Sequence, residues 1–195
     1  MTAEIIVKGV PAPQGSKNPR PIYRGRGPTR VFTGKVALEE SSQAVGPWRE
    51  AVRNAFEKQW RWGRIIGPVR LTRCVFVLTR PSTHYGTGRN AHRLRPDAPA
   101  YPIAKQRNDI DKLLRSTMDG ITSAGVIKKI RPVGVVWADD SQVVGVDLLR
   151  KVYQDDPLAA PLAGQSGAII GVEAVSEPML EQEQPRDRLL AEIGF

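Results

Sequence analysis

The sequence has few of the residues that bind soft metal ions or form covalent cross-links. Its 195 residues include one cysteine, Cys74, and two histidines, His84 and His92. One cysteine excludes a disulfide within the chain and a thiolate zinc site, and two scattered histidines do not form a zinc motif. The apolar neighbours of Cys74 in CVFVL predict a buried strand cysteine. Any metal site within one chain must therefore use oxygen ligands.

Long apolar runs are also lacking. No stretch approaches the roughly 18 apolar residues of a membrane span, and the start MTAEIIVKGVPAPQ lacks the basic-then-apolar pattern of a signal peptide. The apolar fraction of 41% and the charged fraction of 25% are typical of a globular protein. We expect one compact folded unit in the cytoplasm, without a membrane partner.

Positive charge dominates all but the end of the chain. The formal net charge is +9, but residues 155–195 hold eight acidic residues and two arginines, so the first 154 residues alone carry +15. Such a basic body is typical of proteins that bind polyanions; the alternative is a merely soluble basic surface. We predict a folded domain at 1–154, then a linker, a last strand at 167–175 and a disordered acidic tail.

Hydrophobic periodicity predicts a small α/β fold with a mixed sheet and two main helices. Apolar residues recur at helical spacing from Leu38 to Trp62, and Gly46-Pro47 places the regular start of that helix near Trp48. A second helix is expected at 109–123, and strands are expected at 4–10, 69–81, 133–140 and 142–153. In the last of these, Val144, Val146, Leu148 and Val152 share one predicted face.

Two loop-like segments concentrate the basic residues. Residues 16–32 place lysine and arginine among Pro, Gly and aromatic residues, which predicts a basic arm or hairpin for phosphate contacts; a solvated loop is the alternative. Residues 82–108 form a second basic segment that leads directly into an acidic motif.

Two acidic pairs are the candidate metal ligands. Asp109 and Asp111 flank one residue and point the same way in an extended chain, but Asp109 can equally be the N-cap of the helix that follows. Asp139-Asp140-Ser141 suits a metal site and also suits an ordinary turn. Carboxylates of this kind are ligands that Mg²⁺ prefers. Arg115, one turn after Asp111, can contact a phosphate or form an i,i+4 ion pair.

Three ordered motifs carry a family resemblance over about residues 4–153. The succession VPAPQGSKN, DIDKLLRSTMDGITSAG and DDSQVVGVDLLRKVY resembles the RusA Holliday-junction resolvases of bacteria and their phages. The resemblance implies a homodimer that cuts four-way DNA junctions by paired symmetric nicks with Mg²⁺, or Mn²⁺ in its place. It implies that Asp109, Asp111 and Asp140 are the catalytic metal-binding acids, with Asp139 beside them, and that Arg115 occupies the position of a functional lysine.

The sequence departs from this pattern in three places. Lys112 replaces an asparagine common in the family, and Arg115 replaces lysine, which changes a point charge into a fork. Residues 128–136, KKIRPVGVV, lengthen a connection that is usually short, and so form an extended hairpin near DNA or shift Asp140 relative to Asp111. The residues expected to contact DNA are Lys17, Arg20, Arg24, Arg26, Lys105, Arg107, Lys112, Lys128, Lys129 and Lys151.

The predicted function is therefore a Mg²⁺-dependent endonuclease acting on branched DNA. The main alternative is a recombination accessory protein that binds branched DNA without cutting it. A third hypothesis, an RNA-binding basic protein, leaves both acidic pairs unexplained.

Overall fold

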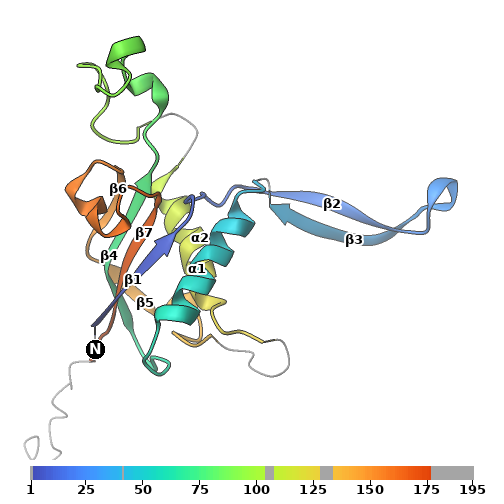
Figure 1. Cartoon of the computed structure of the whole chain (residues 1–195). Helices are drawn as coiled ribbons and strands as arrows, with labels where there is room; N and C mark the ends of the chain where they lie inside the picture. Colours follow the sequence, from blue (N-terminus) through green and yellow to red (C-terminus); the bar gives the residue numbers. More distant parts are fainter. Residues whose placement is uncertain (1, 41, 104–107, 128–133, 177–195) are drawn as a thin grey trace, which may run out of the picture.

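A five-stranded mixed sheet, two main helices and a projecting two-stranded hairpin make up the computed structural model (Figure 1). It describes residues 2–40, 42–103, 108–127 and 134–176. The predicted mixed α/β architecture with two main helices is confirmed, whereas a single chain does not test the predicted dimer. Among the described residues no helix is long and apolar enough to cross a membrane.

The sheet is built around β4 (Val69–Leu78) and β7 (Gly167–Ala174). β7 pairs antiparallel with both β1 (Thr2–Lys8) and β4, so the stretch where a last strand was predicted lies within the sheet. On the other side of β4, β5 (Val143–Val146) and β6 (Leu149–Tyr153) pair in parallel with its successive halves. Backbone bonds from Asp147 N to Leu71 O (2.9 Å) and from Cys74 N to Leu148 O (2.7 Å) bridge the break between them.

Both helices cover one face of this sheet (Figure 1). α1 (Val45–Gln59) buries Val45, Trp48, Val52 and Phe56, whose three- and four-residue spacing predicted a helix here. It begins three residues before the predicted start, because a helix tolerates proline within its first turn, where the amide hydrogens have no intrahelical partner. α2 (Ile110–Thr122) buries Leu113, Thr117 and Ile121, and the buried indole of Trp48 donates to Thr117 Oγ1 at 3.0 Å.

Close packing of α1 against α2 depends on Gly120. A Cβ at this position would lie 2.8 Å from Val52 Cβ and 3.0 Å from Arg49 O. We expect Gly120→Ala to lower the free energy of unfolding by about 1–3 kcal/mol through overpacking, although alanine favours helix. The matched control is Gly46→Ala in α1, where a Cβ meets nothing within 4 Å. Urea unfolding of both variants checks this; equal stability of Gly120→Ala and wild type would contradict the packing.

The other face of the sheet is only partly covered. The short 3₁₀ segment η5 (Pro157–Leu162) packs Ala159 and Leu162 against Val75, Val77 and Ile169. Cys74 of β4 is buried, as predicted, and burial raises the pKa of its thiol to about 12. It is therefore a packing residue.

The predicted basic arm is a β-hairpin that projects from the body (Figure 1). It pairs β2 (Lys17–Arg24) with β3 (Val31–Glu40) in antiparallel register, with a bulge between Pro21 and Tyr23. Residues 38–40, assigned above to the start of the helical pattern, belong to β3. Cross-strand partners share a face, so one face is apolar, with Pro19/Leu38, Pro21/Val36 and Tyr23/Phe32.

The strand predicted at 133–140 was wrong, and so was the inward face predicted for Val144. Within the described part of 133–140 the chain is irregular: Trp137 is buried and its indole donates to Thr122 Oγ1 at 2.8 Å. Gly134 lies so close to the end of α2 that a Cβ at this position would lie 2.5 Å from Thr122 O. This segment therefore wraps the end of α2. In the predicted strand 142–153, Val146, Leu148 and Val152 pack on a core as expected. Val144 is 66% exposed and Val143 packs on the core in its place, because the register of β5 against β4 shifts between Val143 and Gly145. Residues 128–133 of the predicted extended hairpin lie outside the described residues.

Candidate active site

The start of α2 presents the first acidic pair. Asn108 has a left-handed backbone with φ 67°, and Asp109 follows at the N-cap position of α2. Its backbone carbonyl accepts from Leu113 N at 3.0 Å, but its carboxylate makes no capping hydrogen bond. The side chain of Asp109 is therefore not used for the capping role that competed with a metal-binding role.

Two lysines surround that carboxylate. Lys112 Nζ donates to Asp109 Oδ2 at 2.6 Å, and Lys151 Nζ donates to the Asn108 carbonyl at 3.0 Å, which ties β6 to the start of α2. The hydrogen bond from Lys112, its charge and the charge of Lys151 lower the pKa of Asp109. Asp111 lies exposed in the first turn, where the helix dipole favours negative charge. The start of α2 therefore presents two exposed carboxylates, that of Asp109, which is ionised, and that of Asp111.

Asp139 has a structural role in the second pair. It caps the 3₁₀ turn η4 (Asp140–Gln142): Asp139 Oδ1 accepts from Ser141 N at 2.9 Å, and Gln142 Oε1 accepts from Ala138 N at 2.7 Å. Hydrogen bonds from Ser141 lower the pKa of Asp139. Gln142 Nε2 also donates to the carbonyls of Ile65 and Gly67. This network fixes the turn, and with it Asp140, to the body of the domain.

Asp140 lies at the far end of α2 from Asp109. It lines a cavity of about 310 Å³ with Asp119, Thr122, Ser123, Val126, Gly134, Ala138 and Asp139. Asp119 also forms an ion pair with Arg49 of α1. Sequence reasoning did not select Asp119, although its spacing of eight residues from Asp111 put it on the same side of the predicted helix.

The two acidic pairs therefore do not share one pocket in this chain. Asp111 and Asp119 are eight residues apart, which is roughly 12 Å along a helix axis, and Asp140 shares the cavity of Asp119. Across the described ranges, no three Asp, Glu, His or Cys residues form a group that could hold a metal ion. The three-aspartate centre and the role of Arg115, which is exposed on α2, stay predictions.

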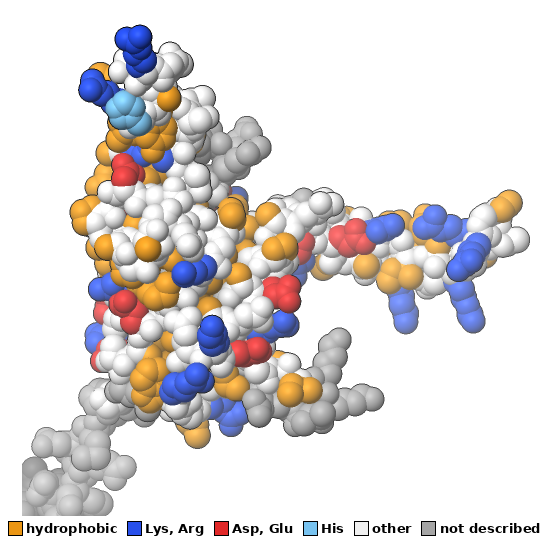
Figure 2. Space-filling view, viewed as in Figure 1, with side chains coloured by type: hydrophobic (Ala, Val, Ile, Leu, Met, Phe, Trp, Pro, Cys, Tyr) orange, Lys and Arg blue, Asp and Glu red, His pale blue; other side chains and the backbone are white. Residues whose placement is uncertain are grey.

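The predicted DNA-contacting residues fall into three sets. Lys17, Arg20, Arg24 and Arg26 lie exposed on the hairpin or at its tip, Lys112 and Lys151 lie at the start of α2, and Lys105, Arg107, Lys128 and Lys129 lie outside the described residues. Figure 2 shows lysine and arginine side chains gathered along the hairpin. Arg20 pairs with Glu39 at 2.8 Å, an exposed pair of little energetic weight.

Comparison with known proteins identifies the class of enzyme. The endodeoxyribonuclease RusA family matches residues 12–159, well over half of the chain. The chain therefore belongs to the RusA endodeoxyribonuclease family, whose enzymes are Holliday-junction resolvases. No curated protein sequence matches it. The family match covers both acidic pairs and the hairpin.

Proposed function

We propose that the protein is a Mg²⁺-dependent endonuclease that resolves four-way and other branched DNA by paired symmetric nicks. The observation that carries this proposal is the carboxylate of Asp109, which lies at a helix N-terminus, exposed and ionised, without a capping role. It stands within the matched family region of a basic chain. Oxygen donors of this type suit Mg²⁺ and leave coordination positions for water and phosphate.

Asp109, Asp111 and Asp140 would hold the metal, with Asp139 positioning Asp140 through the η4 cap. When bound, Mg²⁺ supplies an activated water and neutralises charge on the phosphodiester. Arg115 follows Asp111 by one helical turn and is exposed, so its guanidinium is placed to contact the scissile phosphate. A planar fork suits bidentate contact with phosphate oxygens.

The position of Asp140 favours a metal site that is assembled from both protomers of the predicted homodimer. Within one chain Asp140 lies at the end of α2 opposite to Asp109 and Asp111. In a two-fold dimer of antiparallel α2 helices, the Asp140 end of one protomer faces the Asp109 end of its partner. We therefore propose that each metal site combines Asp109 and Asp111 of one protomer with Asp140 of the other. The two-fold axis then supplies two sites for paired nicks.

Lys112 occupies a place beside Asp109 that a cation would take. Its ammonium lies 2.6 Å from Asp109 Oδ2, so metal binding must displace it. We expect Lys112→Asn to lower the Mg²⁺ concentration for half-maximal cleavage by about two- to fivefold, as suits an exposed ion pair. Titration of the cleavage rate with Mg²⁺ measures this, and an unchanged midpoint would contradict competition. Lys58→Asn, on α1, is the control.

The hairpin would contribute phosphate contacts. Replacing Arg20 and Arg24 together by glutamine should weaken binding and reduce the slope of log K against log salt by up to about 0.9 per lost contact. Fluorescence anisotropy with a four-way junction at several salt concentrations measures the slope. Arg73→Gln is the matched control, because Arg73 pairs with Glu4 on the sheet. Equal slopes for all three proteins would show that the hairpin does not contact phosphates.

One observation favours the non-catalytic accessory protein as second candidate: the separation of the two acidic pairs within one chain. A synthetic four-way junction distinguishes the two functions. A resolvase converts it to nicked duplexes only with Mg²⁺ or Mn²⁺, and leaves a linear duplex of the same sequence intact. Retarded migration in a gel with and without metal, and no cleavage in either case, would establish the accessory function instead.

A further inference from the structure

The hairpin of β2 and β3 divides its side chains between two chemically different faces. Cross-strand partners share a face, and three successive pairs on one face are entirely apolar: Pro19/Leu38, Pro21/Val36 and Tyr23/Phe32. Arg20, paired with Ala37, and Arg24, paired with Val31, lie on the opposite face. The hairpin is therefore an amphipathic arm, with its arginines separated from its apolar face.

The apolar face of this arm is open to solvent in the single chain. Its side chains range from 42% exposed at Tyr23 to 65% exposed at Leu38, and the arm stands away from the body (Figure 1). None of them belongs to a core cluster of the described residues. An isolated two-stranded hairpin is only marginally stable in water, so a second surface against this face would stabilise it.

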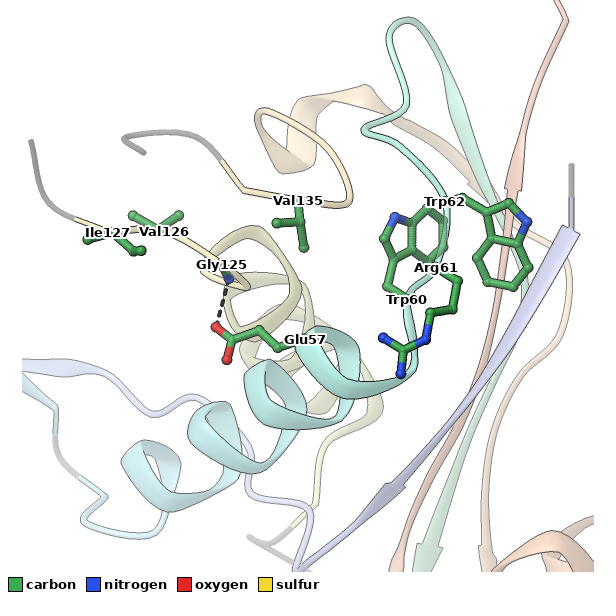
Figure 3. Close-up of a pocket in the computed structure, with 8 residues that line it drawn as sticks. All are labelled: Glu57, Trp60, Arg61, Trp62, Gly125, Val126, Ile127 and Val135. Carbon is green, nitrogen blue, oxygen red and sulfur yellow. Dashed lines mark hydrogen bonds between the residues drawn. The ribbon is translucent and has the colours of Figure 1, made fainter. Parts of the chain in front are cut away.

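An exposed ring of the body has the support that the arm lacks. Trp62, which is 37% exposed, packs edge-to-face on Trp60 with 5.2 Å between the ring centroids, beside Arg61 at the end of α1 (Figure 3). Trp60 is buried in the core cluster. Trp62 is thus joined to the core of its own chain, whereas Tyr23 and Phe32 pair across the hairpin, 5.8 Å between centroids.

The arm leaves the body beside the start of α2. Ser116 Oγ donates to Ala12 O at 2.7 Å, and Gln14 N donates to Lys112 O at 3.1 Å, so the chain is fixed to the first half of α2 just before β2 begins. In the dimer of antiparallel α2 helices proposed above, this half lies beside the Asp140 end of the partner's helix. The arm therefore starts next to the second protomer.

We propose that the apolar face of the hairpin docks on a second copy of this chain, as an arm exchanged between the two protomers. This rests on the proposed function for its dimer, and it names a surface that holds the dimer together. The docked arm keeps Arg20 and Arg24 on its outer face, where DNA phosphates reach them. DNA bound to the apolar face instead would leave both arginines pointing away from it.

The size of the arm suits this contact. An eight-residue strand is about 26 Å long and two paired strands are about 10 Å wide, so one face covers roughly 260 Å². Two-fold symmetry repeats the contact. Two arms and two receiving surfaces then bury about 1,000 Å², which is near the lower limit for a specific protein interface.

Two valines of β3 provide a matched test. Val36 lies on the apolar face and Val31 on the arginine face, and they are 53% and 67% exposed. Val36→Lys should raise the dimer dissociation constant at least about 100-fold, because two-fold symmetry places an unpaired ammonium in two apolar contacts. Val31→Lys adds the same charge and should change the constant by no more than about twofold. Sedimentation equilibrium without DNA measures both.

Photo-cross-linking identifies what the apolar face contacts. Val36→Cys and Val31→Cys are each labelled with a benzophenone maleimide, while Cys74 stays unlabelled because it is buried and the pKa of its thiol is raised. Irradiation should give a covalent dimer from Val36→Cys and little from Val31→Cys. Mixing isotope-labelled with unlabelled protein distinguishes links between protomers from links within one chain.

Four results would overturn the proposal. They are wild type that stays monomeric, equal dissociation constants for the two lysine variants, cross-links from Val36→Cys only within one chain, and an unchanged dimer whose junction binding is weakened by Val36→Lys alone. The last result would assign the apolar face to DNA. Cleavage is a separate measurement: a protein that exchanges arms but cuts no junction in Mg²⁺ refutes the proposed function and leaves this contact standing.

Discussion

Asp111→Asn should abolish junction cleavage in Mg²⁺, with a rate at least about a hundredfold below wild type. Loss of residues that merely support a metal ligand already costs roughly 10- to 100-fold, and this substitution removes a charged ligand itself. Asp111 is exposed in the first turn of α2, so the substitution leaves the core untouched. Single-turnover cleavage of a labelled four-way junction measures the rate.

Junction binding by Asp111→Asn distinguishes a loss of catalysis from a loss of folding or of DNA binding. The variant should bind the junction in EDTA as tightly as wild type or slightly more tightly, because one negative charge near the DNA is removed. Asp97→Asn is the control, since Asp97 is exposed and its ion pair is with Arg95 of the loop before α2. Cleavage by Asp111→Asn at the wild-type rate would remove Asp111 from the metal site.

Mixing two inactive variants should restore nicking. If the metal site combines Asp111 of one protomer with Asp140 of its partner, a mixed dimer of Asp111→Asn and Asp140→Asn has one intact site and one doubly altered site. Random exchange of subunits makes roughly half of the dimers mixed. We expect each variant alone to cleave at least about a hundredfold more slowly than wild type. The mixture should nick one strand without resolving the junction.

The controls for this mixture test the arrangement directly. Wild type mixed with the double variant Asp111→Asn/Asp140→Asn should give mixed dimers without an intact composite site, whereas a site within one chain would survive in them. Denaturation and joint refolding of the two variants ensures exchange. No activity in the mixture of single variants would place all three aspartates in one protomer.

The helices and their buried faces could be predicted from the sequence because they depend on local periodicity. Trp48, Val52 and Phe56 repeat at helical spacing within one segment, and so do Leu113, Thr117 and Ile121; all of them are buried. The hairpin was indicated by its composition of Pro, Gly and arginine, but β3 was not. Most of its residues are exposed and pair across to β2, so no burial pattern marks the strand.

The position of Asp140 could not be predicted because tertiary contacts decide it. The apolar run before it looks like a strand, yet Trp137 packs at the end of α2 through Thr122, and Gly134 fits where no side chain can. Gln142 then fixes the turn to the carbonyls of Ile65 and Gly67, more than seventy residues earlier in the sequence. Motif order placed Asp109 and Asp140 in one family pattern, but only the structure shows that α2 separates them.

Cleavage of a supercoiled plasmid that extrudes a cruciform tests whether the protein is a metal-dependent resolvase. We predict linear plasmid in Mg²⁺, because two symmetric nicks across the four-way junction within one binding event open the circle, and intact supercoiled plasmid in EDTA. Linear product formed equally in EDTA would contradict the metal-dependent mechanism. Supercoiled plasmid that stays uncut in both Mg²⁺ and Mn²⁺, although the protein binds it, would contradict the assignment of resolvase activity to these aspartates.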